Sequence, residues 1–184
     1  NMPTASFDEV EEILFDGVGQ TATFTSGQIS SETIALKETS TGISNLIINV
    51  GAGETADFTT MTAGTFDSGS DTITINGVAG AENIVGPNIV STILGNDGAD
   101  NLTGGNQNDI LNGGNHNDAL DGNDGADTLI GGSGDDIYIF NSGDVDLGET
   151  IVEAASGGTD TISIVTTTDF SAMPAASFDE IEII

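Results

Sequence analysis

The chain of 184 residues has no cysteine, no tryptophan and a single basic residue, Lys37. Without cysteine it forms no disulfide and no thiolate metal site, and one histidine, His116, argues against a zinc or copper centre. Thirty acidic residues bring the formal net charge to −29, which repels nucleic acid and anionic membranes. No segment is long and apolar enough to cross a bilayer. We therefore expect neither nucleic-acid binding nor membrane insertion.

The residues of common catalytic sites are missing as well. A Ser-His-Asp or Cys-His set has only His116 to build on. β-Helix enzymes that act on polyuronates need Lys or Arg beside the substrate carboxylate, and Lys37 is the one candidate. The sequence therefore predicts a protein that is not an enzyme.

What the chain does contain is a repeat. From Gly77 to Ile139 seven nine-residue units follow one another without insertion, and the last five are GNDGADNLT, GGNQNDILN, GGNHNDALD, GNDGADTLI and GGSGDDIYI. Position one is always glycine, position six is mostly acidic and position eight is large and apolar. The position-six residues are Glu82, Ser91, Asp100, Asp109, Asp118, Asp127 and Asp136. The position-eight residues are Ile84, Ile93, Leu102, Leu111, Leu120, Leu129 and Tyr138.

Each unit predicts a tight turn followed by a short strand. Gly, Asn and Asp tolerate positive φ, and a lone apolar residue between small or polar neighbours indicates a strand with one buried face. One unit turns the chain halfway round, so two units close a coil of 18 residues and the strands stack in parallel. Asp100, Asp118 and Asp136 then share one edge, and Asp109 and Asp127 share the other.

These acidic edges require a cation. Stacked strands are about 4.8 Å apart, and two carboxylates at that distance repel by about 3 kcal/mol at an effective dielectric constant near 20. A buried leucine contributes only ~1.5–3 kcal/mol, against ~1–2 kcal/mol of backbone entropy for each ordered residue. Calcium is the best candidate, because it accepts about six to eight oxygen ligands from carboxylates and carbonyls in flexible geometry.

The units resemble the RTX (repeats-in-toxin) family of secreted bacterial proteins, whose calcium-binding nonapeptide is G-G-x-G-x-D-x-U-x. The resemblance is close from Gly95 to Ile139, and it implies a right-handed parallel β-roll with several Ca2+ ions between successive turns. The side-chain ligands that it implies are Asp100, Asp109, Asp118, Asp127 and Asp136. The implied ligands with backbone carbonyls are the turn glycines Gly95, Gly98, Gly104, Gly113, Gly122, Gly125, Gly131 and Gly134.

Other polar residues of the repeat have a less defined role. Glu82 and Ser91 depart from the pattern, so the first two units are expected to hold ions weakly or not at all. Asp97 and Asp124 at position three are either additional ligands or solvent-exposed side chains. His116 at position four is expected to adopt a left-handed backbone and offer only its carbonyl. Acidic residues near the exit of the roll are candidates for a further ion: Asp135, Asp144, Asp146, Glu149 and Asp160.

The remaining sequence predicts a less regular part of an all-β fold. Short β-type runs lie at 13–15, 22–24, 33–36, 46–50, 57–61 and 72–75, at spacings of about eleven residues. We interpret them as wider coils of one β-solenoid that narrow into the roll, with a separate Ig-like sandwich as the alternative. The expected organisation is wider coils at 1–76, the β-roll at 77–139, exit and capping strands at 140–171, and the start of another module at 172–184.

The two ends of the sequence are similar to each other. MPTASFDEVEEI at Met2–Ile13 returns as MPAASFDEIEII at Met173–Ile184, 171 residues later, with nine of twelve positions identical. This indicates one module followed by the opening of the next in a tandem array. Solenoid ends expose strand edges that need such a neighbour, so we expect the partner to be another copy, stacked end to end.

These features predict a calcium-dependent structural module of a large, repetitive, secreted bacterial protein at the cell surface, such as an adhesin, a surface-layer protein or an extracellular filament. Its ligands exist only in folded turns, so calcium binding is part of folding. The resemblance implies type I secretion of an unfolded chain. The alternative is a non-catalytic RTX secretion and folding domain of an exported enzyme such as a protease, lipase or epimerase.

Overall fold

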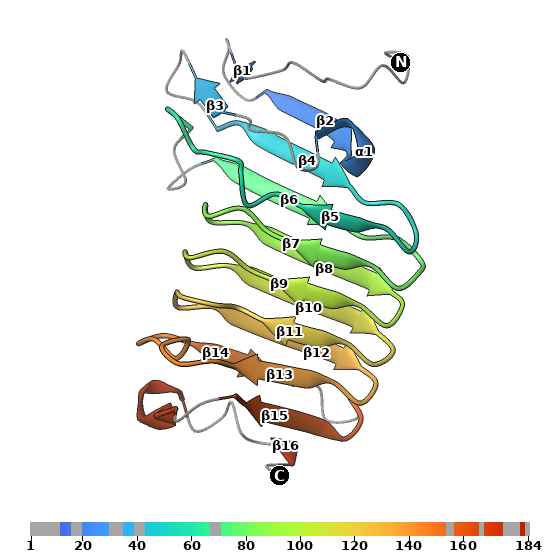
Figure 1. Ribbon diagram of the computed structural model, residues 1–184, viewed down its shortest axis with the longest axis vertical. Coiled ribbons are helices and arrows are strands. Elements are labelled where there is room, and N and C mark those ends of the chain that lie inside the picture. Colours follow the sequence, from blue (N-terminus) through green and yellow to red (C-terminus); the bar gives the residue numbers. More distant parts are fainter. Residues whose placement is uncertain are drawn as a thin grey trace.

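The computed structural model describes residues 12–15, 20–29, 35–38, 43–66, 71–153, 157–165, 168–174 and 181–182. Its strands stack into one elongated solenoid with the first and last strands at opposite ends (Figure 1). The helical elements of the described residues are the four-residue α1 (Ser26–Ile29) and the 3-10 turn η1 (Phe170–Ala172). The prediction of an all-β, parallel β-solenoid is confirmed.

Two parallel sheets form the long faces of the solenoid, and from residue 45 to residue 164 their strands alternate along the chain. The first sheet contains β2 (Thr21–Thr25), β4 (Asn45–Asn49), β6 (Thr72–Asn76), β8 (Thr92–Asp97), β10 (Ile110–Asn115), β12 (Thr128–Ser133) and β14 (Thr150–Val152). The second sheet contains β5 (Thr55–Asp57), β7 (Asn83–Val85), β9 (Asn101–Thr103), β11 (Ala119–Asp121), β13 (Ile137–Phe140), β15 (Asp160–Ile164) and β16 (Ile181–Glu182).

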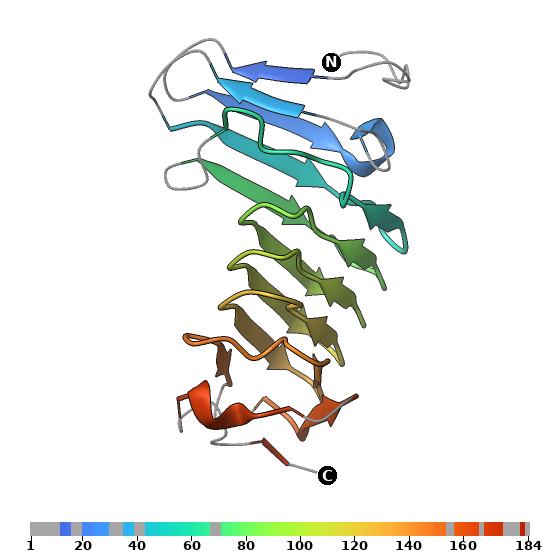
Figure 2. The same ribbon diagram turned by 60° about the vertical axis from the view of Figure 1, so that its left-hand side comes forward.

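The N-terminal coils have a third, shorter stack of strands. β1 (Glu12–Phe15) pairs in parallel with β3 (Ala35–Glu38), side by side at the N-terminal end in Figure 2. Ala35 of β3 in turn forms a parallel bridge with Thr62 of the next coil. These coils therefore have three faces, whereas each coil of the repeat has two.

The length of a coil follows from this difference. Neighbouring residues of β4 and β6, such as Asn45 and Thr72, are 27 residues apart in sequence. Neighbouring residues of β8 and β10, such as Asp97 and Asn115, are 18 residues apart. The wider coils thus narrow into the roll as expected. Because β2, β4 and β6 pair in parallel within the first sheet, the alternative of a separate antiparallel sandwich is wrong.

Each segment predicted as β for residues 1–76 overlaps an observed strand, but one predicted segment is displaced by several residues from its strand. The run at 57–61 overlaps β5 only at Asp57, because the Met61 N–H donates to the Phe58 carbonyl and closes a turn there. Positions 33–34 of another predicted run lie outside the described residues.

Inward-facing side chains form one continuous core along the solenoid axis. In the repeat, all seven position-eight residues from Ile84 to Tyr138 are 0–1% exposed, as the pattern predicts. Beyond the repeat, Phe140 packs edge-on against Phe170 of η1, with ring centroids 5.2 Å apart. No helix among the described residues is long and apolar enough to cross a membrane.

Candidate metal centre

Buried polar residues form two columns, one before the strands of each sheet. We call them the first ladder (Ser91, Asp109, Asp127 and Glu149, which precede β8, β10, β12 and β14) and the second ladder (Glu82, Asp100, Asp118, Asp136 and Asp160, which precede or open β7, β9, β11, β13 and β15). The carboxylates of both ladders are 0–1% exposed. The stacking of Asp100, Asp118 and Asp136, and of Asp109 and Asp127, is therefore as the 18-residue coil predicts.

Hydrogen bonds connect successive members of a ladder. The N–H of Asp100 donates to Oδ1 of Asp118 at 2.8 Å, and the N–H of Asp118 donates to Oδ1 of Asp136 at 2.8 Å. The same bond joins Asp109 to Asp127 at 2.7 Å in the first ladder. One oxygen of each carboxylate is thus paired with the backbone of the preceding coil. This pairing offsets part of the repulsion between stacked charges, which the sequence argument did not foresee.

The other oxygen of most ladder carboxylates has no such partner. These buried atoms without a hydrogen bond are Oδ2 of Asp100, Asp118, Asp127 and Asp136 and Oε1 of Glu149. An unpaired buried carboxylate oxygen is strongly destabilising unless a cation faces it. The only Lys or Arg of the chain, Lys37, is bonded to Glu12 at the N-terminal end. The ladders therefore fit a bound cation.

Position-one glycines make the room for these oxygens. A Cβ added to Gly95, Gly113, Gly122 or Gly131 would lie 2.2–2.4 Å from Oδ2 of the aspartate five residues later. The Cβ on Gly95 would also lie 2.5 Å from the carbonyl oxygen of Gly113 in the next coil. A carboxylate and a carbonyl oxygen therefore converge at Gly95. Such an oxygen-only environment is what Ca2+ prefers.

Burial also changes the protonation of the ladders. Burial, and to a smaller extent neighbouring carboxylates, raise the pKa of Asp118 and of Asp127 to about 7 and that of Glu149 to about 8. Burial raises the pKa of Asp109 to about 6, and it also raises the pKa values of Asp100 and Asp136. Without metal, protons thus compete for the ladder near neutral pH, and a bound divalent ion has to displace them.

The family comparison agrees with this geometry. The RTX calcium-binding nonapeptide repeat family matches residues 94–129 and 112–146, in four copies. These coils are RTX calcium-binding repeats. The match begins in β8, extends past β13 and covers less than a third of the chain. No curated protein and no solved structure matches the chain.

Within the RTX roll, Asp109 differs from the other ladder aspartates. Its Oδ1 accepts from the Ser91 N–H at 2.7 Å, and its Oδ2 accepts from the Gly105 N–H at 2.7 Å. Gly105 lies against Pro87, because an added Cβ would meet the Pro87 carbonyl oxygen at 2.0 Å. The irregular unit that contains Pro87 therefore stacks on the Asp109 turn, and both carboxylate oxygens of Asp109 are already paired.

The departing position-six residue Glu82 is paired as well. Its Oε1 accepts from the Gly53 N–H at 2.8 Å, and its Oε2 accepts from the Val78 N–H at 3.3 Å. Glu82 thus connects the RTX roll to the wider coils through hydrogen bonds alone. Both carboxylate oxygens of Glu82 are therefore paired, and weak or absent ion binding by the first units stays a prediction.

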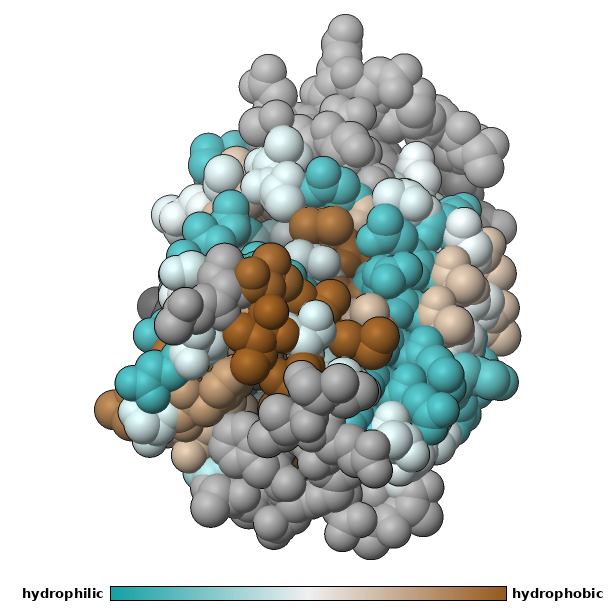
Figure 3. Space-filling view, turned by 60° about the horizontal axis from the view of Figure 1, so that its bottom comes forward, coloured by the Kyte–Doolittle hydropathy of each residue, from teal (hydrophilic) through white to brown (hydrophobic). Residues whose placement is uncertain are grey.

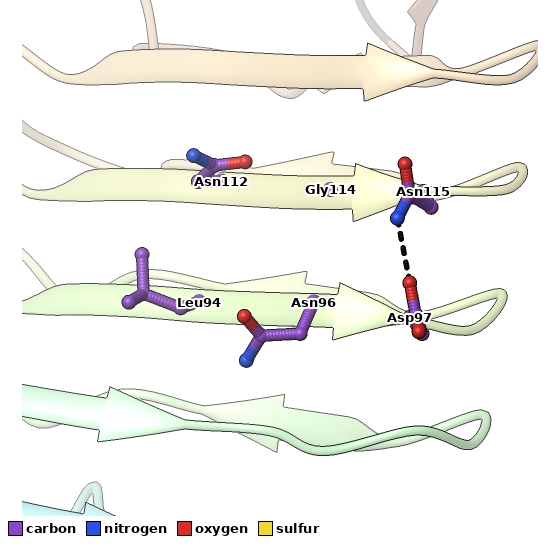
Figure 4. Close-up of a pocket in the computed structure, with 6 residues that line it drawn as sticks. All are labelled: Leu94, Asn96, Asp97, Asn112, Gly114 and Asn115. Carbon is purple, nitrogen blue, oxygen red and sulfur yellow. Dashed lines mark hydrogen bonds between the residues drawn. The ribbon is translucent and has the colours of Figure 1, made fainter.

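The position-three aspartates lie away from both ladders. Asp97 is exposed, and its Oδ1 accepts from the Asn115 side-chain amide at 2.6 Å on the outer surface of the first sheet (Figure 4). This contact lies in a shallow pocket that Leu94, Asn96, Asn112 and Gly114 also line. Asp124 is exposed too. Of the two roles considered for them, the solvent-exposed one fits this placement.

Turn backbones of successive coils touch at position four. His116 has φ 79°, as predicted, and a Cβ on Gly134 in the next coil would lie 2.2 Å from the His116 carbonyl oxygen. Gly98, Gly125 and Gly134 all have positive φ, and an added Cβ would lie 1.4–2.6 Å from a carbonyl oxygen of the preceding coil. In these three units glycine is therefore needed both for conformation and for space.

At the exit of the roll, the structure separates the acidic residues that sequence reasoning had grouped. Glu149 and Asp160 continue the two ladders, 22 and 24 residues after Asp127 and Asp136, and each accepts a hydrogen bond from that aspartate's N–H at 2.9 Å. Asp144 is buried, whereas Asp135 and Asp146 are exposed. Sequence reasoning missed Glu153, because nothing in its spacing relates it to the nonapeptide.

Proposed function

We propose that this chain is a calcium-dependent structural module of a large, repetitive, secreted bacterial protein and has no catalytic role. The main support for the proposal is the set of ladder carboxylate oxygens that have no hydrogen bond. They are buried, unpaired and lined up along both edges of a roll whose repeats bind calcium. Because the ligand geometry exists only in the folded coils, binding free energy becomes folding free energy.

The proposed place of action is outside the cell. Extracellular calcium modules work at about 10⁻⁴–10⁻³ M Ca2+, and we expect this module to fold in the same range. In the cytosol, where calcium is scarce, the charge of −29 would keep the chain expanded and suited to export. After secretion, the same carboxylates would bind calcium and the roll would stiffen.

The proposed partner is another copy of the module, stacked on the C-terminal end. β16 (Ile181–Glu182), within the segment whose sequence repeats the N-terminal one, pairs in parallel with β15 and continues the second sheet. The last coils expose apolar side chains: Ile164 is 47% exposed and Val165 is 61% exposed. Figure 3, which looks toward this end, shows apolar residues gathered there. Both observations support a solenoid that runs on from one module to the next, as in an adhesin, surface-layer protein or filament.

Small-angle X-ray scattering of two modules in tandem tests the proposal. In calcium, we expect a rod whose longest dimension is about that of two stacked solenoids. In chelator, the same chain should expand and lose its rod-like profile. Two modules that tumble independently in calcium would overturn the end-to-end arrangement. A full-length protein with a catalytic domain and no further copies at the 171-residue period would favour the enzyme-attached alternative.

A further inference from the structure

Three acidic side chains meet at the exit of the RTX roll. One carboxylate oxygen from each of Asp136, Glu153 and Asp160 lies within 4.8 Å of the other two. Asp136 belongs to the last regular unit, whereas Glu153 and Asp160 lie beyond the residues that match the RTX family. Glu153 follows β14 and Asp160 opens β15, so the longer coil after the roll folds both back onto Asp136.

This cluster contains a buried oxygen that nothing pairs with. Asp136 and Asp160 are each 1% exposed. Oδ1 of Asp136 accepts from the Asp118 N–H, while Oδ2 of Asp136 is buried and has no hydrogen-bond partner. Asp160 in turn accepts from the Asp136 N–H at 2.9 Å. Lys37, the only Lys or Arg, lies at the opposite end of the solenoid, so no basic side chain compensates these charges.

Tyr138 holds Glu153 in this cluster. Its hydroxyl donates to Glu153 Oε1 and accepts from the Gly131 N–H at 2.8 Å. A Cβ on Gly131 would lie 2.3 Å from Oδ2 of Asp136 and 2.5 Å from the Tyr138 hydroxyl, so both oxygens lie against the same glycine. Leu or Ile occupies the same repeat position in the other units and has no hydroxyl. Tyr138 is thus a positioning residue as well as a core residue.

We propose that Asp136, Glu153 and Asp160 bind one further Ca2+ that closes the exit of the roll. The proposal rests on the proposed function, because it takes calcium as the ion of the roll. The donors are all oxygens, which suits a hard cation and not zinc or copper. The ion ties the last regular coil to the end of β14 and the start of β15. It thereby stabilises the junction where the 18-residue period ends and the repeat no longer supplies its own ligands.

Glu153→Gln and Asp135→Asn form the matched pair that tests this site. Both remove one negative charge at the exit of the roll. Asp135 is exposed and outside the cluster, and its Oδ1 accepts from the Thr159 N–H at 2.9 Å, a bond that asparagine keeps. Calcium bound per chain is measured by equilibrium dialysis of the whole chain. We expect Glu153→Gln to bind one ion fewer than the unchanged chain and Asp135→Asn to bind the same number.

Terbium provides a second readout, because it replaces calcium and emits when a nearby tyrosine is excited. Tyr138 is the only tyrosine of the chain, and there is no tryptophan. We expect Tyr138-sensitised emission to fall in Glu153→Gln and to persist in Asp135→Asn. Tyr138→Phe keeps all three carboxylates, which keeps the proposal testable if Glu153→Gln does not fold. We expect Tyr138→Phe to bind the same number of calcium ions but to lower the affinity for one of them by roughly 10–100-fold, the usual effect of removing a group that orients a ligand.

An unchanged ion count and unchanged emission in Glu153→Gln would overturn the exit site. It would mean that the cluster shares protons and holds no metal. An unchanged set of affinities in Tyr138→Phe would overturn the positioning role of the tyrosine. If the unchanged chain binds no calcium at all, the proposed function itself fails, which distinguishes the two results.

Discussion

The wider coils and the RTX roll share their two long sheets but differ in what lies inside them. Within the described residues, the three-faced coils bury large apolar side chains such as Leu36, Phe58, Met61 and Phe66. A coil of the roll buries two aliphatic residues, for example Leu111 and Leu120, together with two ladder carboxylates. The same parallel pairing thus surrounds a wide apolar core in one region and, in the other, a narrow apolar row with buried carboxylates on both sides.

The difference shows what a third face contributes. Each large apolar side chain that is buried contributes about 1.5–3 kcal/mol, so several per coil give the wider coils a stabilising contribution that needs no ion. A regular two-faced coil buries fewer such residues. Its stability must come from hydrogen bonds along the ladders and from ions that neutralise the buried carboxylates. We therefore expect the two regions to respond differently to calcium.

Removal of calcium should produce the largest difference between them. An ion present at 100 times its dissociation constant contributes about 2.7 kcal/mol, so the loss of several ions matches a whole domain's stability of about 5–15 kcal/mol. We expect chelation at neutral pH to abolish amide-exchange protection at 92–140 and to leave part of it at 43–66. Re-added Ca2+ should restore protection, whereas Mg2+ should not. Simultaneous loss in both regions would show that the wider coils depend on the roll.

Substitution of ladder residues should separate ion ligands from hydrogen-bonding residues. Asp118→Ala removes a buried oxygen that has no hydrogen bond and also the acceptor for the Asp100 N–H. We therefore expect the free energy of unfolding in saturating calcium to fall by about 3–5 kcal/mol. Glu82→Ala removes only hydrogen-bond acceptors, and we expect it to lower the free energy of unfolding by about 1–3 kcal/mol. Chemical denaturation measures the free energy of unfolding of both variants. Equal losses would contradict the ladder assignment.

Loss of the space at a position-one glycine should have a smaller effect that depends on calcium. Gly113→Ala places a Cβ 2.3 Å from Asp118 Oδ2, and we expect a loss of about 1–3 kcal/mol together with weaker calcium binding. Gly27→Ala in α1 is the control, because nothing lies within 4 Å of its Cβ, and we expect a change within about 0.5 kcal/mol. Calorimetric calcium titration and thermal unfolding distinguish the two variants. Full calcium affinity in Gly113→Ala would exclude these oxygens as ligands.

Per pH unit, the smallest effect is that of pH in the absence of calcium. The folded-state pKa values of Asp118 and Asp127 are raised to about 7, so the folded roll binds protons that the unfolded chain releases near pH 4. Stability without calcium should therefore fall as pH rises from about 4 to about 7, by roughly 1 kcal/mol per pH unit for one titrating carboxylate. In saturating calcium this fall should disappear, because the ion displaces the protons and keeps the ladder carboxylates ionised in the folded state. Circular dichroism at several pH values, with and without chelator, checks both expectations. A stability that rises with pH in chelator would contradict the raised pKa values.

Much of the roll was predictable because its pattern is local. Glycine, aspartate and the apolar residue recur every nine residues, and strand alternation then places each Leu or Ile inside and each Asp at an edge. That reasoning gave the parallel stacking, the 18-residue coil and the left-handed His116. The wider coils were predicted less well. The 57–61 run failed as a strand because Phe58 and Met61 close a turn that packs in the core, and no short-range pattern marks such a turn.

By itself, the sequence determined a calcium-binding solenoid, since a strict nonapeptide with one acid per turn leaves few other ways to bury its apolar row and neutralise its charge. The tertiary structure alone decided which carboxylate oxygens are unpaired, as the contrast between Asp109 and Asp118 shows. It also decided that Glu149 and Asp160 continue the ladders and that Glu153 joins Asp136. The reason is that these residues follow loops of irregular length, and only the folded coil returns them to the edge where the repeat has ended.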